Sequence, residues 1–250
     1  MTTSAISVQL YTVREAIAED LLGSLRRLAD AGFDRVEPFA FTRFDGLGDA
    51  LTSTGLGAPT THQGFIADGS IAEVAAAAAS LGITTVIDPF VAPEKWQSAD
   101  DIADTARRLN EAAVIAAEHG ITVGYHNHAH EIESTIDGVT ALEHFASLLD
   151  PAVVLEVDTY WVAVGGADPV ELLGRLGDRV VAIHVKDGPA TAETKDQVAV
   201  GQGSLNIPAI LAAAPNALRV IELDDSRGDR FEAVIASLGY LRSLESEVSA

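Results

Sequence analysis

Short apolar runs alternate with longer segments rich in alanine, leucine and charged residues along the whole 250-residue chain. The short runs carry mainly β-branched and aromatic residues, the composition of parallel strands that are buried on both faces. We therefore predict strands at Ile6–Leu10, Arg35–Pro38, Ala58–His62, Thr84–Asp88, Thr122–His126, Val153–Asp158, Val180–Val185 and Leu218–Leu223. The longer segments have helical spacing, and the clearest helices are predicted at Asp20–Ala31, Ala99–Glu118, Val139–Leu149, Pro169–Leu176 and Asp229–Leu244.

Serine and glycine mark the ends of several predicted helices. Ser98 is a suitable N-cap for the longest of them. A glycine followed by an apolar residue stops a helix before the next strand at Gly32, Gly55, Gly82 and Gly120. Repeated strand–helix units with right-handed connections favour a single α/β domain over residues 1–250, a (β/α)8 TIM barrel. A doubly wound open sheet is the competing fold, but no glycine-rich phosphate loop follows the first strand.

The charge of the chain excludes several classes of partner. Asp and Glu number 37 against 16 Lys and Arg, a formal net charge of −21 with a sequence pI near 4.5. Such a field repels nucleic-acid phosphates and anionic lipid, so neither nucleic acid nor membrane is an expected partner. The chain has no cysteine, which excludes disulfides, thiolate catalysis and zinc sites built from cysteine.

Three stretches bear on location and on loop function. The start of the chain, Met1–Ile6, has neither a basic nor an apolar region, so no signal peptide is expected. The alanine-rich stretch Val74–Ser80 is far too short to cross a bilayer. We therefore expect a soluble, cytoplasmic protein. The long irregular segment Asp187–Asn206 follows the seventh strand on the side where barrel active sites lie, and is a candidate substrate loop or lid.

Polar side chains that can bind metal recur at the carboxyl ends of the predicted strands. In a closed barrel these ends converge on one pocket, where active sites are built. A polar residue at a single strand end is as often structural as functional, but the coincidence over strands five to eight favours a site. The residues at the strand ends are His62, Asp88, His126, His128, Asp158, His184 and Glu222.

Alternation along the strands adds neighbours on the same face. Glu156 shares a strand face with Asp158, and Lys186 shares one with His184. Glu131 follows the two histidines of strand five by three residues. Carboxylate oxygens and imidazole nitrogens together suit Mn, Co, Fe or Zn, and carboxylates with water also hold Mg. The sequence therefore predicts a divalent-metal site at the strand ends.

Most of these residues also have a structural interpretation. Ordinary buried ion pairs, for example with Lys186, would account for the two carboxylates of strand six. His62 and Asp88 fit substrate contact and loop hydrogen bonding equally well. Trp161 fits the core as well as the apolar face of a sugar ring. The two aspartates at positions 224 and 225 fit caps of the following turn.

Six motifs lie in order along nearly the whole chain. They are Val8-Gln-Leu-Tyr-Thr-Val-Arg14, Gly124-Tyr-His-Asn-His-Ala-His-Glu-Ile132, Leu155-Glu-Val-Asp-Thr-Tyr-Trp161, His184-Val-Lys-Asp-Gly188, Gly201-Gln-Gly and Glu222-Leu-Asp. Each motif alone is weak, but the ordered set is fairly specific. It resembles the xylose-isomerase-like TIM barrels, in particular their sugar phosphate isomerase/epimerase branch.

The resemblance implies a divalent metal held by four strand-end residues, usually two glutamates, an aspartate and a histidine. By motif, three of these fall on Asp158, His184 and Glu222, while the first glutamate is replaced by His126. Glu131 is the candidate replacement for His126 as a ligand. We place manganese first, with Co, Mg, Fe and Zn as alternatives. The histidine-rich motif is also similar to inosose-dehydratase-like members and to relatives that cleave 3-keto-glycosides.

The function that the resemblance implies is isomerisation or epimerisation of a ketose or keto-sugar, a small-molecule substrate. A metal on the carbonyl would acidify the neighbouring C–H bond, and Glu222 with His126 or His128 would take the proton. Lys186 would offset the developing negative charge. Contact with the substrate, or orientation of the groups that contact it, is assigned to His62, Asp88, Glu156, Trp161 and Asp187.

Two other functions stay open. Loss of a β-substituent in place of reprotonation would make the chain a lyase, either a dehydratase or a subunit that cleaves 3-keto-glycosides or C-glycosides. A non-catalytic binding or assembly subunit is the second, although Asp158, His184 and Glu222 are all present. Alanine-rich outer helices also suit a homo-oligomer or a complex with a second subunit.

Overall fold

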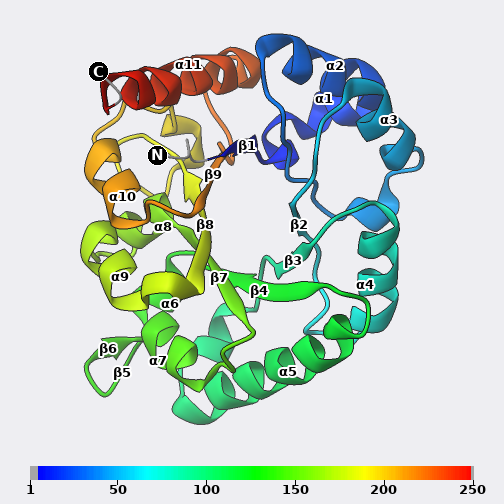
Figure 1. Ribbon diagram of the computed structural model, residues 1–250. Coiled ribbons are helices and arrows are strands. Elements are labelled where there is room, and N and C mark those ends of the chain that lie inside the picture. The colour runs from blue at the N-terminus through cyan, green and yellow to red at the C-terminus, as the bar shows by residue number, and fades with distance from the viewer. Residues whose placement is uncertain (1–4, 249–250) are drawn as a thin grey trace.

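A curled parallel sheet forms the centre of the protein in the computed structural model, which describes residues 5–248 (Figure 1). In order across the sheet, the strands within this range are β1 (Ile6–Val8), β9 (Leu218–Ile221), β8 (Val180–Val185), β7 (Val154–Asp158), β4 (Thr122–His126), β3 (Thr85–Asp88) and β2 (Thr60–His62). Every neighbouring pair is parallel. Met1–Ser4, on which much of the signal-peptide expectation rests, lie outside the described residues.

The second predicted strand, Arg35–Pro38, is not a regular strand, so this prediction is wrong in detail. Pro38 has no N–H to give to a ladder, which limits the pairing to isolated bridges. The segment still joins both edges of the sheet, because Glu37 N donates to Val8 O and His62 N donates to Pro38 O, each at 2.8 Å. These bonds close the sheet into a barrel, and the predicted (β/α)8 architecture is confirmed.

Helices surround the barrel and cover the outer face of the sheet (Figure 1). They are α1 (Arg14–Glu19), α2 (Leu21–Ala31), α3 (Leu47–Thr54), α4 (Ile71–Ser80), α5 (Ala99–Ala117), α6 (His130–Glu133), α7 (Ala141–Leu148), α8 (Thr159–Val164), α9 (Pro169–Leu176), α10 (Ile207–Ala213) and α11 (Arg230–Val248). Short 3-10 turns lie at Leu10–Val13, Phe41–Arg43, Pro93–Trp96, Gly177–Arg179 and Thr194–Asp196. Buried side chains such as Leu28, Leu109 and Phe145 fill the layer between helices and sheet.

The predicted helix Val139–Leu149 begins two residues later than expected. A two-stranded hairpin of β5 (Thr135–Ile136) and β6 (Val139–Thr140) precedes it. The turn residues Asp137 and Gly138 have φ of 51° and 87°, and positive values at both positions are typical of a type I′ hairpin. The helix then starts from a capping box made by its N-cap threonine and a glutamate.

The predicted helix ends are confirmed. The Ser98 side chain accepts the N–H of Asp101 at 3.2 Å and so caps α5. The four predicted stop glycines all have left-handed φ, between 71° and 105°, which residues with a Cβ adopt only with strain. They are Gly32, Gly55, Gly82 and Gly120.

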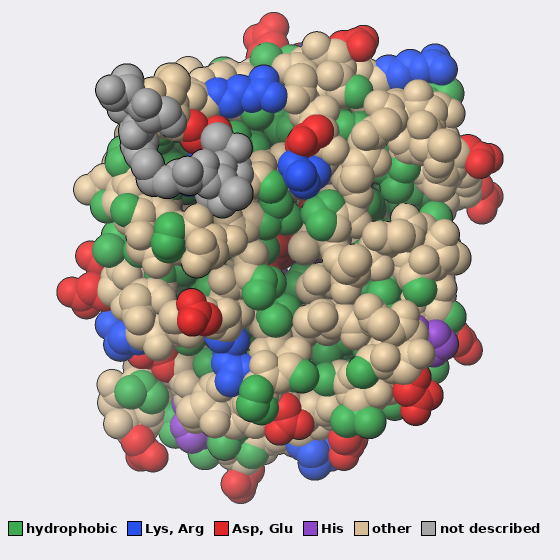
Figure 2. Space-filling model, viewed as in Figure 1, with side chains coloured by type: hydrophobic (Ala, Val, Ile, Leu, Met, Phe, Trp, Pro, Cys, Tyr) green, Lys and Arg blue, Asp and Glu red, His purple; other side chains and the backbone are tan. Residues whose placement is uncertain are grey.

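The surface agrees with the acidic composition. On the face shown in Figure 2, Lys and Arg side chains are scattered singly among Asp and Glu, without a gathered basic patch. None of the helices between residues 5 and 248 is long and apolar enough to cross a membrane.

Candidate metal and catalytic site

The ladder register brings the predicted site residues together at the carboxyl ends of the strands. Asp158 on β7 lies opposite His184 on β8, and Glu156 lies opposite His126 on β4. Because these strands alternate their side chains, these residues all face the barrel interior. The buried polar residues of this region are His126, Glu156, Asp158, His184, Lys186 and Glu222, each no more than 5% exposed.

Three of the four predicted metal ligands form one compact set, which we call the mouth group: Asp158, His184 and Glu222. One ligand atom from each lies within 4.8 Å of the others. His184 Nδ1 is 2.7 Å from Glu222 Oε2. The fourth predicted ligand, His126, points its Nε2 at Asp158 Oδ2 from 3.8 Å, at the edge of the group. Two carboxylates and two imidazoles therefore face one volume, a donor set that suits a borderline divalent ion.

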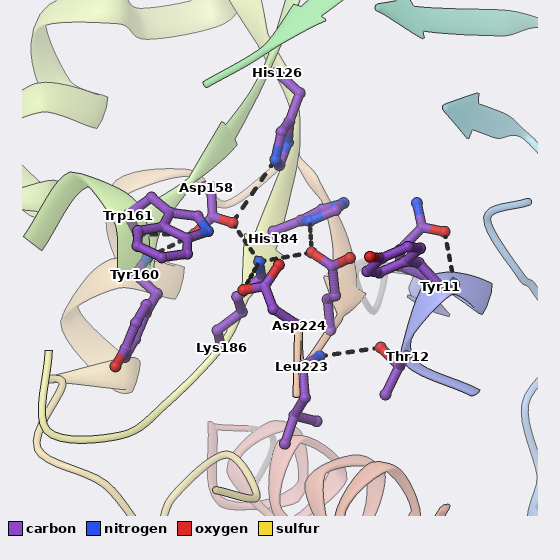
Figure 3. A network of polar contacts seen from close by, with 12 residues as sticks. Tyr11, Thr12, His126, Asp158, Tyr160, Trp161, His184, Lys186, Leu223 and Asp224 are labelled. Atoms are coloured by element: carbon purple, nitrogen blue, oxygen red, sulfur yellow. Dashed lines mark hydrogen bonds and ion pairs between the residues drawn. The ribbon is translucent and has the colours of Figure 1, made fainter. Parts of the chain in front are cut away.

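A buried ammonium lies against the mouth group (Figure 3). Lys186 Nζ is 2.8 Å from Asp158 Oδ2, 2.7 Å from Glu222 Oε2 and 2.8 Å from Asp224 Oδ2. Burial lowers the pKa of Lys186, but these carboxylates outweigh it and raise the pKa well above the ordinary value. Gln197 Nε2 also donates to the Asp224 carboxylate, at 2.8 Å. The lysine is therefore a fixed positive charge.

Behind the mouth group lies a second set, the inner group, made by His62, His126, Glu156 and His184. All three imidazoles approach a single atom, Glu156 Oε2. His62 Nε2 is 2.5 Å from it, and a nitrogen of each of the other two rings is 3.3 Å from it. His184 belongs to both groups, because its Nδ1 faces Glu222 and its Nε2 faces the inner group.

Glu37 is a site residue that the sequence analysis missed. Its side chain is fully buried, and its Oε1 lies 2.8 Å from His184 Nε2 and 3.4 Å from His62 Nε2. Its position near the carboxyl end of the predicted second strand is the same criterion that identified the other site residues. Asp224 was also underestimated, since its carboxylate contacts Lys186 rather than only capping a turn.

Several buried polar atoms around the two groups have no hydrogen-bond partner within the described residues. Two of them have close neighbours without hydrogen-bond geometry: His126 Nδ1 lies 3.3 Å from Glu156, and Asp158 Oδ2 pairs ionically with Lys186. An unmade hydrogen bond on a buried polar atom is costly, so such atoms mark places where a ligand fits. The atoms are His126 Nδ1, His128 Nδ1, Glu156 Oε1, Asp158 Oδ2 and Trp161 Nε1.

Aromatic rings form the rim of the site beside the mouth group. Phe90, which is 54% exposed, packs edge-on against His128 and His130 at 5.6 and 5.8 Å. The Trp161 ring centre lies 6.2 Å from that of His128. Burial lowers the pKa of His128 to about 4, so its ring is neutral at neutral pH. A neutral imidazole and an indole face are suitable neighbours for a sugar ring.

Three predicted carboxylates bond to neighbouring segments and belong to neither group. Asp88 accepts the N–H groups of Phe65, Ile66 and Phe90, so its carboxylate organises loops. Glu131, the candidate replacement for His126 as a ligand, accepts the Tyr125 hydroxyl at 2.6 Å on one oxygen and the His128 N–H at 2.8 Å on the other. Asp187 is enclosed by its own loop.

The Asp187 carboxylate holds the Asp187–Asn206 loop by accepting four backbone N–H groups. Gly188 and Leu205 donate to Oδ1, and Gly201 and Gly203 donate to Oδ2, at 2.9–3.2 Å. The packing is close, since a Cβ at Gly203 would lie 2.1 Å from Asp187 Oδ1. The loop is therefore tied to the end of β8 from within.

Asp187→Asn is expected to loosen this loop. The amide nitrogen would turn a donor toward backbone donors, and about 3 kcal/mol of stability should be lost with the charged hydrogen bonds. Hydrogen exchange should speed up at the amides of Gly201, Gly203 and Leu205. Asp196→Asn, in the same loop at a side chain that is 38% exposed, is the control and should leave exchange at these amides unaltered. Equal protection of these amides from exchange in both variants would show that the Asp187 carboxylate does not hold the loop.

Comparisons with known proteins agree on the fold. The model of the family described as xylose isomerase-like TIM barrel matches residues 25–244. An inosose dehydratase from Geobacillus kaustophilus is 37% identical over 111 residues, 40% of this chain and 33% of that protein. The match thus spans about a third of the length of that relative.

Two solved structures share the fold along nearly the whole chain. A sugar phosphate isomerase/epimerase from Parabacteroides distasonis has a TM-score of 0.82 at 24% identity, covering 96% of this chain and 94% of its own. The IOLI protein, solved with a binding zinc atom, has a TM-score of 0.75 at 14% identity, covering 97% of this chain and 98% of its own.

Proposed function

We propose that this chain, which belongs to the xylose isomerase-like TIM barrel family, is a divalent-metal-dependent enzyme that isomerises or epimerises a ketose or keto-sugar. The observation that carries the proposal is the convergence of Asp158, His184 and Glu222 beside the Lys186 ammonium. Fixed charges aimed at the place where negative charge develops are the main source of stabilisation when a proton leaves the carbon next to a carbonyl.

The donor atoms fit a divalent metal, and we assign it to His126, Asp158, His184 and Glu222. The closeness of the donor atoms supports the assignment, since one atom each of Asp158, His184 and Glu222 lie within 4.8 Å of one another and His126 Nε2 lies 3.8 Å from Asp158 Oδ2. So does the zinc atom in the structurally similar IOLI protein. We place manganese first among Mn, Co, Fe, Zn and Mg. When bound, such an ion polarises a carbonyl and acidifies the neighbouring C–H bond.

Side chains of this chain would move the proton. Burial raises the pKa of Glu222, but Lys186 and His184 outweigh it and hold the pKa well below its usual range, so the carboxylate is ionised at neutral pH. We assign Glu222 as the base that takes the proton from carbon. His128 or His126 would take up a proton from solvent and deliver it to the carbon. Lys186 would stay protonated and face the developing oxyanion.

A lyase is the second candidate, and the 37% identity to an inosose dehydratase favours it. Proton removal at the same carbon would then be followed by loss of a hydroxyl or glycosyl group from the next carbon. The proton that Glu222 has taken would balance the step, and His128 would pass it to the leaving group. The two candidates use the same residues and differ only in the step after proton removal.

Metal content and solvent exchange test the proposal. The parent protein is expected to carry a near-stoichiometric divalent ion, which an Asp158→Ala/His184→Ala variant should lose. His119→Ala, an exposed change just after the end of α5, is the control and should keep the metal. In D2O, the metal-loaded parent should place deuterium on the carbon next to the carbonyl of a keto-sugar.

The outcomes separate the candidates. An isomer or epimer that has gained deuterium supports the isomerase, and a product that has lost a hydroxyl or glycosyl group supports the lyase. A parent protein that holds no metal after reloading with each ion would contradict both the isomerase and the lyase, and would leave a binding or assembly role.

A further inference from the structure

His184 is held at both ring nitrogens by carboxylates from opposite sides. Its Nδ1 lies 2.7 Å from Glu222 Oε2 in the mouth group. Its Nε2 lies 2.8 Å from Glu37 Oε1 and 3.3 Å from Glu156 Oε2. All of these side chains are 5% exposed or less, so water does not compete for the contacts. The two sides of the ring therefore face different environments.

Both carboxylate oxygens of Glu37 accept hydrogen bonds from neighbouring side chains. Gln9 Nε2 donates to its Oε1 at 2.8 Å, and the Thr60 hydroxyl donates to its Oε2. The backbone of Glu37 pairs with the carboxyl end of β1, since Glu37 N donates to Val8 O and Leu10 N donates to Glu37 O. These contacts fix the carboxylate so that its Oε1 also faces the ring nitrogens of His184, at 2.8 Å, and His62, at 3.4 Å.

We propose that Glu37 is a positioning residue for the metal ligand His184: it accepts the Nε2 proton and so leaves Nδ1 as the nitrogen that binds metal. The inference rests on the proposed metal site. On the Nε2 side the ring meets the oxygens of Glu37 and Glu156, which can accept its proton. On the Nδ1 side it meets Glu222, an assigned ligand that forms one cluster with His184 and Asp158. A histidine that binds metal through one nitrogen is oriented by what its other nitrogen donates to.

The test measures metal affinity and the identity of the bound nitrogen. Glu37→Gln keeps the side-chain shape and removes the charged acceptor, and should weaken zinc binding by about 10–100-fold, the usual effect of losing such a partner. Nitrogen-15 NMR of the zinc-loaded, histidine-labelled parent should show the proton of His184 on Nε2 and the metal on Nδ1. Neither readout depends on turnover, and a loss of packing alone would not move the proton between nitrogens.

Two neighbouring threonines provide a matched control. Thr60→Val removes the hydroxyl that donates to Glu37 and should weaken zinc binding in the same direction, by less than Glu37→Gln. Thr61→Val makes the same change one residue away, where the hydroxyl donates to Pro38 O at 2.8 Å, and should leave the affinity unchanged. Both sites are buried, so any general loss of stability affects the two variants alike.

Failure of the inference is distinguishable from failure of the proposed function. A parent that binds zinc through His184 Nε2, or a Glu37→Gln variant with the parent's affinity, would overturn the positioning role and leave the metal site standing. A parent that binds no zinc at all would overturn both.

Discussion

Lys186→Met is expected to lose activity by about 100-fold or more and to destabilise the metal-free protein by about 3–5 kcal/mol. The ammonium is 1% exposed and lies 2.7–2.8 Å from Asp158, Glu222 and Asp224. Methionine fills most of the same volume, so the effect comes from charge. Without the lysine, three carboxylates, two of them buried, would repel one another.

Urea unfolding of the metal-free proteins and steady-state rates of the loaded ones measure the two parts of this prediction. Lys95→Met is the control, because among residues 5–248 Lys95 pairs only with Asp101, at 3.0 Å, and its side chain is 54% exposed. Exposed pairs contribute about 0–1 kcal/mol, so the control should stay close to the parent. A Lys186 variant as stable as the Lys95 variant would show that the lysine does not neutralise the site.

The pH dependence of this stabilisation is set by the direction in which the lysine pKa moves. Because the folded pKa of Lys186 is raised above its ordinary value of 10.5, its contribution is fully present below that value. The contribution is lost as the pH rises through the folded pKa. The stability difference between parent and Lys186→Met should therefore be constant through the neutral range and shrink only in strong alkali.

The barrel and most of the mouth group could be predicted because both arise from short-range patterns. Alternation along a strand puts Asp158 and His184 on the inner face, and parallel pairing then brings strand ends to one place. Lys186, two residues after His184, is found in the same way. Its place among three carboxylates could not be predicted, because that depends on the side-chain directions of different strands.

Some predicted residues lie outside the two groups because loop N–H groups compete for a carboxylate at a strand end. Asp88 and Asp187 lie at strand ends like the ligands do, yet Phe65 and Ile66, in the loop after β2, donate to Asp88, and Gly201 and Gly203 donate to Asp187. Glu131 lies near the strand-five histidines but turns toward the Tyr125 hydroxyl. Glu37 was overlooked although the predicted second strand contains it, and its carboxylate is held by Gln9 and Thr60 from other segments, which the pattern of its own strand does not show.

Glu222→Gln is expected to lower the rate of proton exchange at the substrate carbon by about 100- to 10,000-fold, the range for removal of a positioned acid or base. The amide is nearly the same size as the carboxylate but cannot accept a proton. It still offers an oxygen to Lys186 and to a metal, so part of the metal affinity should remain. Exchange should be measured in D2O at metal concentrations that saturate both the parent and the variant. Any remaining difference in rate then comes from loss of the base and not from loss of the metal.

The pH profile of the parent gives an independent check on Glu222. Lys186 and His184 keep its carboxylate ionised well below the usual pKa of 4.5, so the base should not be lost between about pH 8 and pH 5. Glu232→Gln, an exposed change on α11, is the control and should leave exchange at the parent's rate. If Glu222→Gln holds metal and still exchanges deuterium at the parent's rate, Glu222 serves only as a ligand. The base is then one of the two strand-five histidines, and His128→Gln against His126→Gln tells them apart.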